Sequence, residues 1–321
     1  MPTNLIHPDD AALRAEPVVA LATLVGATGS TSKKLGAKMI VGASGRLIGG
    51  VTIGGCVDAQ VIEAADALVA GTADRRLLSI SLDDDEAWEI GLTCGGTVDV
   101  LLQRVRPNDA SDPVVAAHRR AVEMVERGES AVIVTPLDAG EMHTVGEDEA
   151  PDAAAGERVF LDRIAPPMTL VIVGAGHIAM SLTTLARELD MHTVIVDGRG
   201  RYATRERFPF ADEIRVGMPS EIVATIRPTA RVAVVLVAHD YKYDLPVLRA
   251  LLRSPVGYLG MLGSKKRGAA VRDMLRGEGY TDDELARVHS PIGLDLGGRA
   301  PAEVALSILA EIVAVRYGKR A

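Results

Sequence analysis

The stretch VIVGAGHIAMSL, residues 171–182, constrains the fold of the second half of the chain. An apolar run leads directly into Gly174 and Gly176, and Ala179 completes the spacing G-x-G-x-x-A where a helical pattern begins. The first glycine permits a tight turn from strand to helix, and the second leaves room for a pyrophosphate beside the backbone. The stretch therefore predicts a dinucleotide-binding turn, although a turn kept only for helix–strand packing has the same spacing.

The residues on either side of this turn extend the prediction to a domain. Apolar runs at 169–173 and 232–237 alternate with helical patterns at 178–189 and 241–253. Continuous Val and Ile runs between helices are typical of the buried strands of a parallel sheet. We therefore expect a Rossmann-like, doubly wound parallel sheet over residues 167–321.

Polar residues follow the expected strands on the side where an open sheet binds ligands. Asp197 ends the apolar run after the glycine turn, where a carboxylate can hold a ribose hydroxyl, and His177 follows the second glycine. His177 either contacts a ligand or caps the turn. Asp240 and Asp244 follow a later run, and a helix cap is the favoured interpretation of Asp240. These features raise an NAD(P)-dependent oxidoreductase as one function class, but the dehydrogenase constellation of His, Lys or Tyr is missing.

A second candidate anion site is the segment GSKKR near residue 265. Ser264 is expected to cap a helix whose first turn holds Lys265, Lys266 and Arg267. Three cations there oppose the positive end of the helix dipole, which a bound phosphate would offset. A solvated basic turn is the alternative.

The first part of the chain predicts a small mixed α/β domain over residues 1–140, with a boundary at 141–166. The boundary is rich in Gly, Pro, Asp and Glu, with short strands expected near 142–145 and 158–161. Before it, strands are expected at 18–24, 38–41, 77–82, 98–105 and 131–135, and helices at 57–70 and 113–127.

Both cysteines of the chain lie beside glycine pairs. Cys56 precedes the expected helix 57–70, whose unpaired amides favour a thiolate, and Cys94 precedes an expected strand. We expect the two thiols to converge on one anion or metal site, with Cys56 the stronger candidate. A small buried hydrophobe is the alternative for either residue. The glycines that let amides approach the sulfurs are Gly54, Gly55, Gly95 and Gly96.

Composition narrows the function classes. A net charge of −8 argues against nucleic acid as a partner. The purest apolar run, VAVVLVA, is too short to span a bilayer. The first residues lack the pattern of a secretory signal, and two cysteines suit a reducing compartment. We therefore expect a cytoplasmic protein with no membrane partner.

Several blocks of the chain, taken in order, resemble the XdhC/CoxI family. They are GSTSKKLGAKMIV, GGVTIGGCVD, CGGTVDVLL, VIVGAGHIA, YLGMLGSKKR and HSPIGLDLGGRAPAEVALSILAEIVAVR. The resemblance implies an XdhC/CoxI domain followed by a Rossmann-like domain. Ser32 and Lys33 stand where the family usually has Pro-Arg, and Asp58 stands where Glu is common. Since lysine lacks the guanidinium fork, these departures imply altered anion recognition.

The resemblance also implies a function. Family members are accessory proteins of xanthine dehydrogenase and related molybdenum hydroxylases. They bind molybdenum cofactor (molybdopterin), assist its sulfuration and pass it to the apo-enzyme, so a non-catalytic chaperone is expected. Partners would be the apo-hydroxylase, a sulfurtransferase and a second copy of the chain, and Cys56 would contact molybdenum. The competing interpretations are the NAD(P)-dependent oxidoreductase and a structural partner with an empty Rossmann domain.

Overall fold

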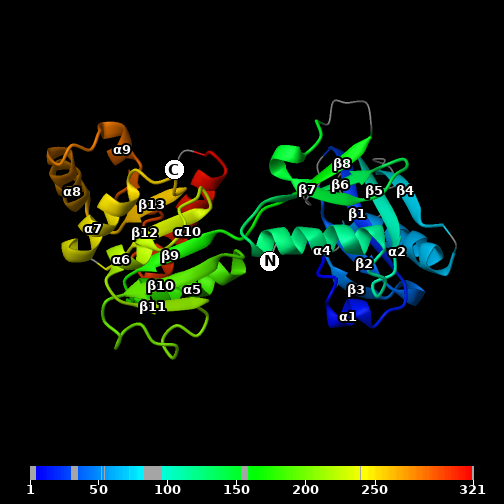
Figure 1. Ribbon diagram of the computed structural model, residues 1–321, viewed down its shortest axis with the longest axis horizontal. Helices are drawn as coiled ribbons and strands as arrows, with labels where there is room; N and C mark the ends of the chain where they lie inside the picture. Colours follow the sequence, from blue (N-terminus) through cyan, green and yellow to red (C-terminus); the bar gives the residue numbers. More distant parts are fainter. Residues whose placement is uncertain are drawn as a thin grey trace. The chain divides into compact units, whose positions relative to one another are not determined.

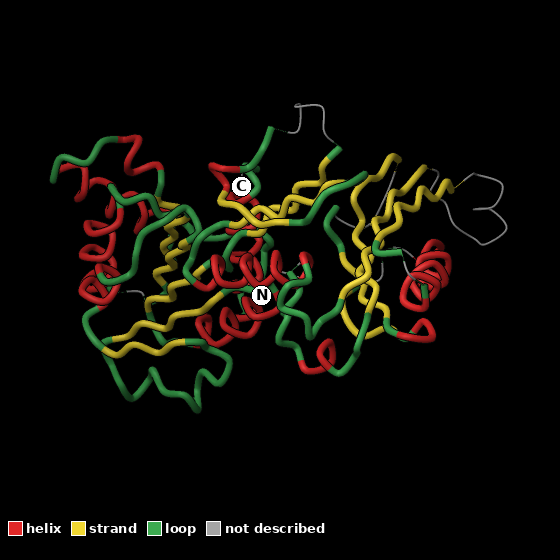
Figure 2. Tube along the Cα trace, turned by 45° about the vertical axis from the view of Figure 1, so that its right-hand side comes forward, coloured by secondary structure: helices red, strands yellow, loops and turns green. Residues whose placement is uncertain are grey.

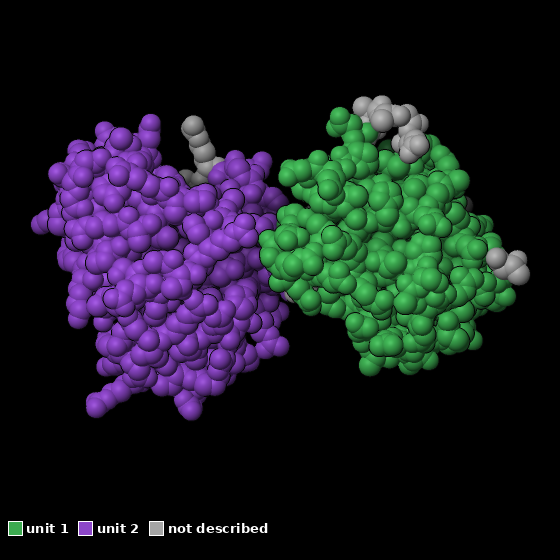
Figure 3. Space-filling model, viewed as in Figure 1, with its two compact units in different colours: residues 1–166 green, residues 167–321 purple. Residues whose placement is uncertain are grey.

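The computed structural model describes residues 5–29, 35–51, 53, 55–71, 73–82, 96–152, 158–238 and 240–319. At residues 29, 55, 56 and 82 only the backbone is described. The chain divides into two compact units, unit 1 (residues 1–166) and unit 2 (residues 167–321), coloured separately in Figure 3.

Unit 1 is built on a five-stranded antiparallel sheet with the order β3-β2-β1-β5-β4. Both faces are buried, because alternate residues of its strands are apolar on each side. On one face Ala22 and Leu24 pack against helix α2, and on the other Leu21 packs in a core with helix α4 (Figure 1). The elements are α1 (Ala11–Arg14), β1 (Val19–Gly29), β2 (Lys38–Val41), η1 (Ala43–Gly45), β3 (Leu47–Gly50), α2 (Gly55–Ala70), β4 (Arg75–Leu82), β5 (Gly96–Val105) and α4 (Pro113–Glu126).

A three-stranded antiparallel sheet, β7-β6-β8, completes unit 1. It comprises β6 (Ala131–Pro136), β7 (His143–Gly146) and β8 (Val159–Ile164), with the short turn η2 (Glu147–Glu149) after β7. The segment 141–166, expected to be a domain boundary with two short strands, supplies β7 and β8, which flank β6. It belongs to unit 1. Glu147, Asp148 and Glu149 form the turn η2, while Met142 and Ile164 are buried in the core.

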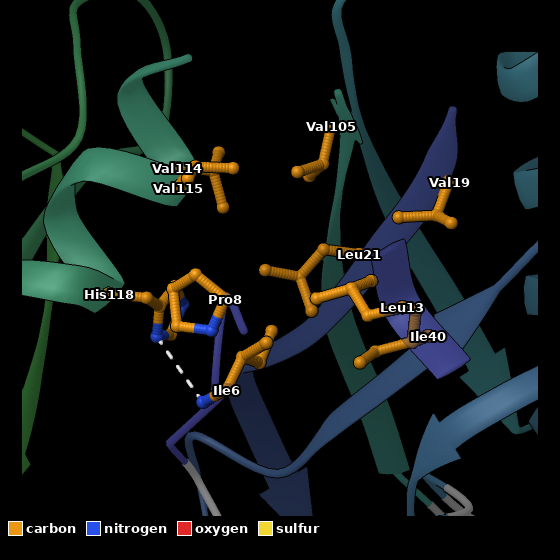
Figure 4. Close-up of a pocket in the computed structure, with 10 residues that line it drawn as sticks. All are labelled: Ile6, Pro8, Leu13, Val19, Leu21, Ile40, Val105, Val114, Val115 and His118. Carbon is orange, nitrogen blue, oxygen red and sulfur yellow. Dashed lines mark hydrogen bonds between the residues drawn. The ribbon is translucent and has the colours of Figure 1, made fainter. Parts of the chain in front are cut away.

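The core beneath the α4 face encloses a small apolar cavity of about 20 Å³. Pro8, Leu21 and His118 are among its lining residues (Figure 4). His118 is 1% exposed, and its Nδ1 accepts a hydrogen bond of 3.4 Å from the backbone amide of Ile6. A buried titratable ring thus fastens the N-terminal segment to α4.

Unit 2 contains a six-stranded parallel sheet with the order β11-β10-β9-β12-β13-β14. This confirms the predicted Rossmann-like, doubly wound fold. The strand order reverses between β9 and β12, and in open α/β sheets ligands bind outside the carboxyl ends of the strands at such a point. The strands are β9 (Thr169–Val173), β10 (His192–Asp197), β11 (Glu213–Val216), β12 (Val232–Leu236), β13 (Tyr258–Met261) and β14 (Val288–His289).

Helices cover both faces of this sheet, as Figures 1 and 2 show. Leu170 and Ile172 of β9 face a core shared with α5 and α10, while Val171 and Val173 face a core shared with α7 and α8. None of the helices of the described residues is both long and apolar enough to cross a membrane. The helices of unit 2 are α5 (His177–Glu188), α6 (Pro219–Ala224), α7 (Tyr241–Leu251), α8 (Lys265–Gly277), α9 (Asp282–Ala286) and α10 (Pro301–Arg316).

Candidate functional site

The glycine turn joins β9 to α5 at the point where the strand order reverses. Gly174 has φ +112°, and an added Cβ would lie 2.7 Å from the amide nitrogen of Ala238. Gly174 is therefore required for close packing against the segment that follows β12. An added Cβ at Gly176 would meet no described atom within 4 Å. The second glycine thus faces open space, as a turn that admits a phosphate requires.

The amides at the start of α5 border this open space. Gly176 is the N-cap of α5 and has no side chain with which to cap the first-turn amides. His177 is the first helical residue and is exposed. Uncapped amides at the positive end of a 12-residue helix favour an anion.

Asp197 lies at the end of β10 beside the turn, where the sequence places it, but its carboxylate is already occupied. Its Oδ2 accepts hydrogen bonds from the Ala175 amide (2.8 Å) and from Arg199 Nη2 (2.9 Å). Its Oδ1 accepts from the Arg199 amide (2.8 Å) and from Arg199 Nε (2.9 Å). A carboxylate offers about four acceptor positions. This geometry gives Asp197 the task of fixing the turn and does not favour a ribose contact.

The electrostatics agree with this role. Burial raises the pKa of the Asp197 carboxyl, but the hydrogen bonds from Arg199 and Ala175 outweigh burial, so its pKa lies below the usual value. The guanidinium of Arg199 is half exposed and lies 4.4 Å from the ring centroid of Tyr202. Sequence reasoning missed Arg199, although its position two residues after Asp197 was a usable signal. Its charge is paired with the Asp197 carboxylate beside the glycine turn.

The SKKR segment forms the start of α8 and divides into two parts. Ser264 is the N-cap, as expected, and accepts a hydrogen bond of 3.2 Å from the Arg267 amide. Lys265 and Lys266 are exposed. Arg267 instead donates to the fully buried Asp244 carboxylate at 2.6 Å. The expectation that all three cations need an external anion is therefore wrong for Arg267, because α7 supplies its counter-charge.

A buried polar network that sequence reasoning missed lies where β13, β14 and α10 meet. The Tyr258 hydroxyl donates to the carboxylate of Glu311, which lies 3.2 Å from His289 Nδ1 and accepts from the Gly293 amide at 2.7 Å. The rings of Tyr258 and His289 stack with centroids 4.6 Å apart. An acid in the otherwise apolar stretch ALSILAEIVAV was the available signal. The network fastens the loop after β14 to α10.

Burial raises the pKa of the Tyr258 hydroxyl, and its bond to Glu311 raises it further. Burial also raises the pKa of Glu311, but the hydrogen bonds from His289 and Tyr258 prevail and hold it below the usual value. Tyr258 is therefore neutral and Glu311 ionised at neutral pH. Such a pair orients the imidazole of His289 through its Nδ1.

The thiol site predicted in unit 1 lies only partly within the residues that the structure describes. Cys94, Gly54 and Gly95 lie outside the described residues. The backbone of Gly55 and Cys56 forms the start of α2, two residues before the predicted start of this helix. Gly96 begins β5 with φ +145°. Convergence of the two cysteines stays a prediction, and among the described residues no group of three or more His, Cys, Asp or Glu side chains is placed to hold a metal ion.

Lys38 does not join the basic surface that the segment GSTSKKLGAK suggests. Its ammonium is 3% exposed, pairs with the Asp162 carboxylate of β8 and donates to the Gly36 carbonyl at 3.3 Å. The strand β2 directs the side chain inward against the second sheet, so its charge is used inside unit 1. Residues 30–34, the rest of that basic segment, lie outside the described residues.

Comparisons with known proteins cover both units. The sequence model of a protein family described as "XdhC and CoxI family" matches residues 12–81. A second family model, described as "XdhC Rossmann domain", matches residues 170–312. A probable xanthine dehydrogenase subunit from Bacillus subtilis is 28% identical over 324 residues, with 96% of each chain covered. The molybdenum cofactor insertion chaperone PaoD of Escherichia coli is 27% identical over 297 residues, covering 92% of this chain and 83% of PaoD.

The fold is also similar to a solved structure. A crystal structure of a xanthine dehydrogenase from Bacillus halodurans matches with a TM-score of 0.79 at 25% identity. The match covers 97% of this chain and 95% of that one. The similarity therefore extends over both units and not only over the Rossmann-like sheet.

Proposed function

Since this chain belongs to the XdhC and CoxI family, we propose that it is an accessory chaperone that binds molybdenum cofactor and delivers it to a xanthine dehydrogenase-type hydroxylase. The observation that carries this function is the match to PaoD, a molybdenum cofactor insertion chaperone, over 92% of the chain. The relative from Bacillus subtilis, which matches over nearly its whole length, points to the same class of client.

The carboxyl edge of the sheet in unit 2 supports the anionic part of this proposal. The open approach at Gly176 and the uncapped amides at His177 together suit a phosphate or pyrophosphate. We assign the phosphate end of the cofactor to this turn. Lys265 and Lys266 at the start of α8 would add longer-range attraction for the same anion.

Unit 1 carries the proposed thiol site. Molybdenum takes sulfur ligands, and the backbone of Cys56 lies at the start of a 16-residue helix, where amides stabilise a thiolate. We propose Cys56, with Cys94 as a second thiol, as the contact for molybdenum. Sulfuration by a partner sulfurtransferase, assembly as a homodimer and a cytoplasmic location belong to the same proposal.

The oxidoreductase interpretation is not favoured. Its strongest sequence support was Asp197 as a ribose ligand, and that carboxylate already accepts four hydrogen bonds from the protein. The relatives that match over most of the chain are named for xanthine dehydrogenase and for molybdenum cofactor insertion.

The deciding experiment is analysis of the ligand that co-purifies from cells able to make the cofactor. Acidic oxidation should release a fluorescent pterin, and the loaded protein should activate an apo-hydroxylase. Release of NAD or NADP instead would overturn the chaperone function. A protein that binds the hydroxylase but carries no ligand would be a structural partner.

A further inference from the structure

A polar cavity of about 170 Å³ lies within unit 1, and its lining residues are distinct from the start of α2 and from the glycine turn of unit 2. It is formed where the start of β4, the end of β5, the start of α4 and the turn between β6 and β7 meet. Its wall combines polar side chains, Gln103 and Arg75 among them, with the apolar Pro113, Val114 and Met142. A cavity of about 150 Å³ accommodates a benzene-sized ring, so this one can hold a small cyclic molecule.

Three buried polar atoms of the lining residues have no hydrogen-bond partner within the described part of the chain: Oε1 of Gln103, Nε of Arg75 and Nε of Arg104. Gln103 is only 8% exposed. The Nη groups of Arg75 donate to the backbone carbonyls of Pro136 and Gly140. Leaving buried polar atoms unsatisfied lowers stability, so such atoms require an explanation.

Two of the three atoms belong to directly paired residues. Gln103 of β5 lies opposite Arg75 of β4 in the antiparallel register, so the two side chains leave the same face of the sheet. An acceptor therefore stands beside a donor. The rest of the lining comprises the apolar Pro113, Val114 and Met142, Gly140 and the charged Asp74, Arg104, Arg106, Asp112 and Glu141. This arrangement is complementary to a lactam edge, in which an N–H adjoins a C=O, while apolar side chains contact the faces of a flat ring.

We propose that this cavity binds a small planar heterocycle through its lactam edge. The ring N–H donates to Gln103 Oε1, and the ring carbonyl accepts from Arg75 Nε. Pterins and pyrimidine bases both present this edge. This site goes beyond the proposed function. It is tested by binding of a small heterocycle, whereas the proposed function is tested by activation of a hydroxylase. Either proposal can therefore fail while the other holds.

The first test compares ligands on the full-length wild-type protein by titration calorimetry. Uracil and pterin are the lactam probes, and 1,3-dimethyluracil, in which methyl groups replace both N–H hydrogens, is the control without a ring donor. We expect at least one lactam probe to bind at millimolar concentration or better, and dimethyluracil to bind at least tenfold more weakly. Preference for uracil would identify a pyrimidine site, and preference for pterin a pterin site. Absence of binding by both probes, or equal binding of uracil and dimethyluracil, would overturn the proposal.

The second test replaces the unpartnered amide. Gln103→Met keeps the length of the side chain and removes the acceptor, and Gln60→Met on the exposed side of α2 is the matched control. We expect Gln103→Met to weaken the lactam probe at least tenfold without lowering the thermal midpoint, because no described hydrogen bond is lost. Unchanged affinity would show that the probe binds elsewhere. A lower midpoint with no effect on binding would show that Gln103 serves the fold through bound water.

Discussion

At the scale of single residues, unit 1 buries a few titratable side chains in its interior. His118 is fully buried, and burial, aided by the nearby charge of Lys38, holds its pKa well below the usual value. Lys38 is itself buried against Asp162. Burial lowers the pKa of Lys38, while its attraction to Asp162 opposes this change. These groups make the stability of unit 1 sensitive to pH and to substitution.

His118 should make unit 1 less stable in mild acid. In the unfolded chain its pKa is about 6.5, whereas the folded protein keeps the ring neutral. Its contribution to stability is therefore complete above pH 6.5 and is lost as the pH falls toward the folded pKa. The loss approaches about 1.4 kcal/mol per pH unit. Urea unfolding between pH 5 and 8 should show this slope, and His118→Leu should remove it. The exposed His143 is the control, since His143→Leu should leave the slope in place.

Removing one charge of the buried Lys38–Asp162 pair should lower the free energy of unfolding more than removing both charges. Asp162→Asn leaves the Lys38 ammonium without its counter-charge, and we expect a loss of about 3 kcal/mol in the free energy of unfolding. The double variant Lys38→Met/Asp162→Leu should recover most of that loss. At the exposed pair of Arg158 and Asp138, Asp138→Asn should change stability by less than about 1 kcal/mol. Equal small effects at both pairs would contradict the importance assigned to burial.

At the scale of elements, function is assigned to helix starts and the turns before them. In the turn before α5 the two glycines differ, because Gly174 packs against Ala238 whereas Gly176 faces open space. At the start of α8, Arg267 is held by Asp244 while its neighbouring lysines remain exposed. Residues adjacent in sequence therefore have separable effects on stability and on binding.

Gly176→Val should weaken cofactor retention with little loss of stability. The added side chain meets no described atom, but it fills the space that a phosphate would enter. Pterin content after purification and the thermal midpoint are the two measurements. Gly277, where an added Cβ also meets no described atom, is the control, and Gly277→Val should retain the cofactor. Normal pterin content in Gly176→Val would exclude this turn as the phosphate site.

Substitutions at the start of α8 should affect cofactor binding and folding stability separately. Lys265→Gln/Lys266→Gln should change the free energy of unfolding by less than about 0.5 kcal/mol and reduce the salt dependence of cofactor binding. Arg267→Gln should lower stability by about 2 kcal/mol, since it removes the counter-charge of the buried Asp244. A double lysine variant with unchanged salt dependence would make these lysines a solvated surface.

At the scale of the whole molecule, each unit has its own hydrophobic cores. The two core clusters of unit 2 contain residues of unit 2 alone, and those of unit 1 contain residues of unit 1 alone. Independent cores are the physical basis of domains that fold separately. The proposed phosphate site lies in unit 2 and the proposed thiol site in unit 1, so each can be tested within its own unit.

Residues 167–321 expressed alone should therefore fold as an independent domain. We expect a cooperative thermal transition and the circular dichroism of an α/β protein. The full chain purified from the same cells is the control. A fragment that does not fold would show that unit 2 depends on unit 1.

The alternation of strands and helices could be predicted from the sequence, because apolar periodicity and turn residues are local properties. β2 and β9 have the predicted bounds, and the Rossmann-like sheet follows from the run of elements after residue 167. The cap at Ser264 and the glycine turn were also predictable, because each depends on neighbours within a few residues.

Which charged groups are paired inside the protein depends on the tertiary structure. Asp197 pairs with Arg199, Arg267 pairs with Asp244, and Lys38 pairs with Asp162, which is distant in sequence. The last two partnerships join different elements, so no local pattern reveals them. The segment 141–166 also depends on such contacts. Its composition resembles that of a linker, but β6 pairs with both of its strands. A charge available to a ligand is one that the fold has left without an internal partner, and that depends on contacts between residues distant in sequence.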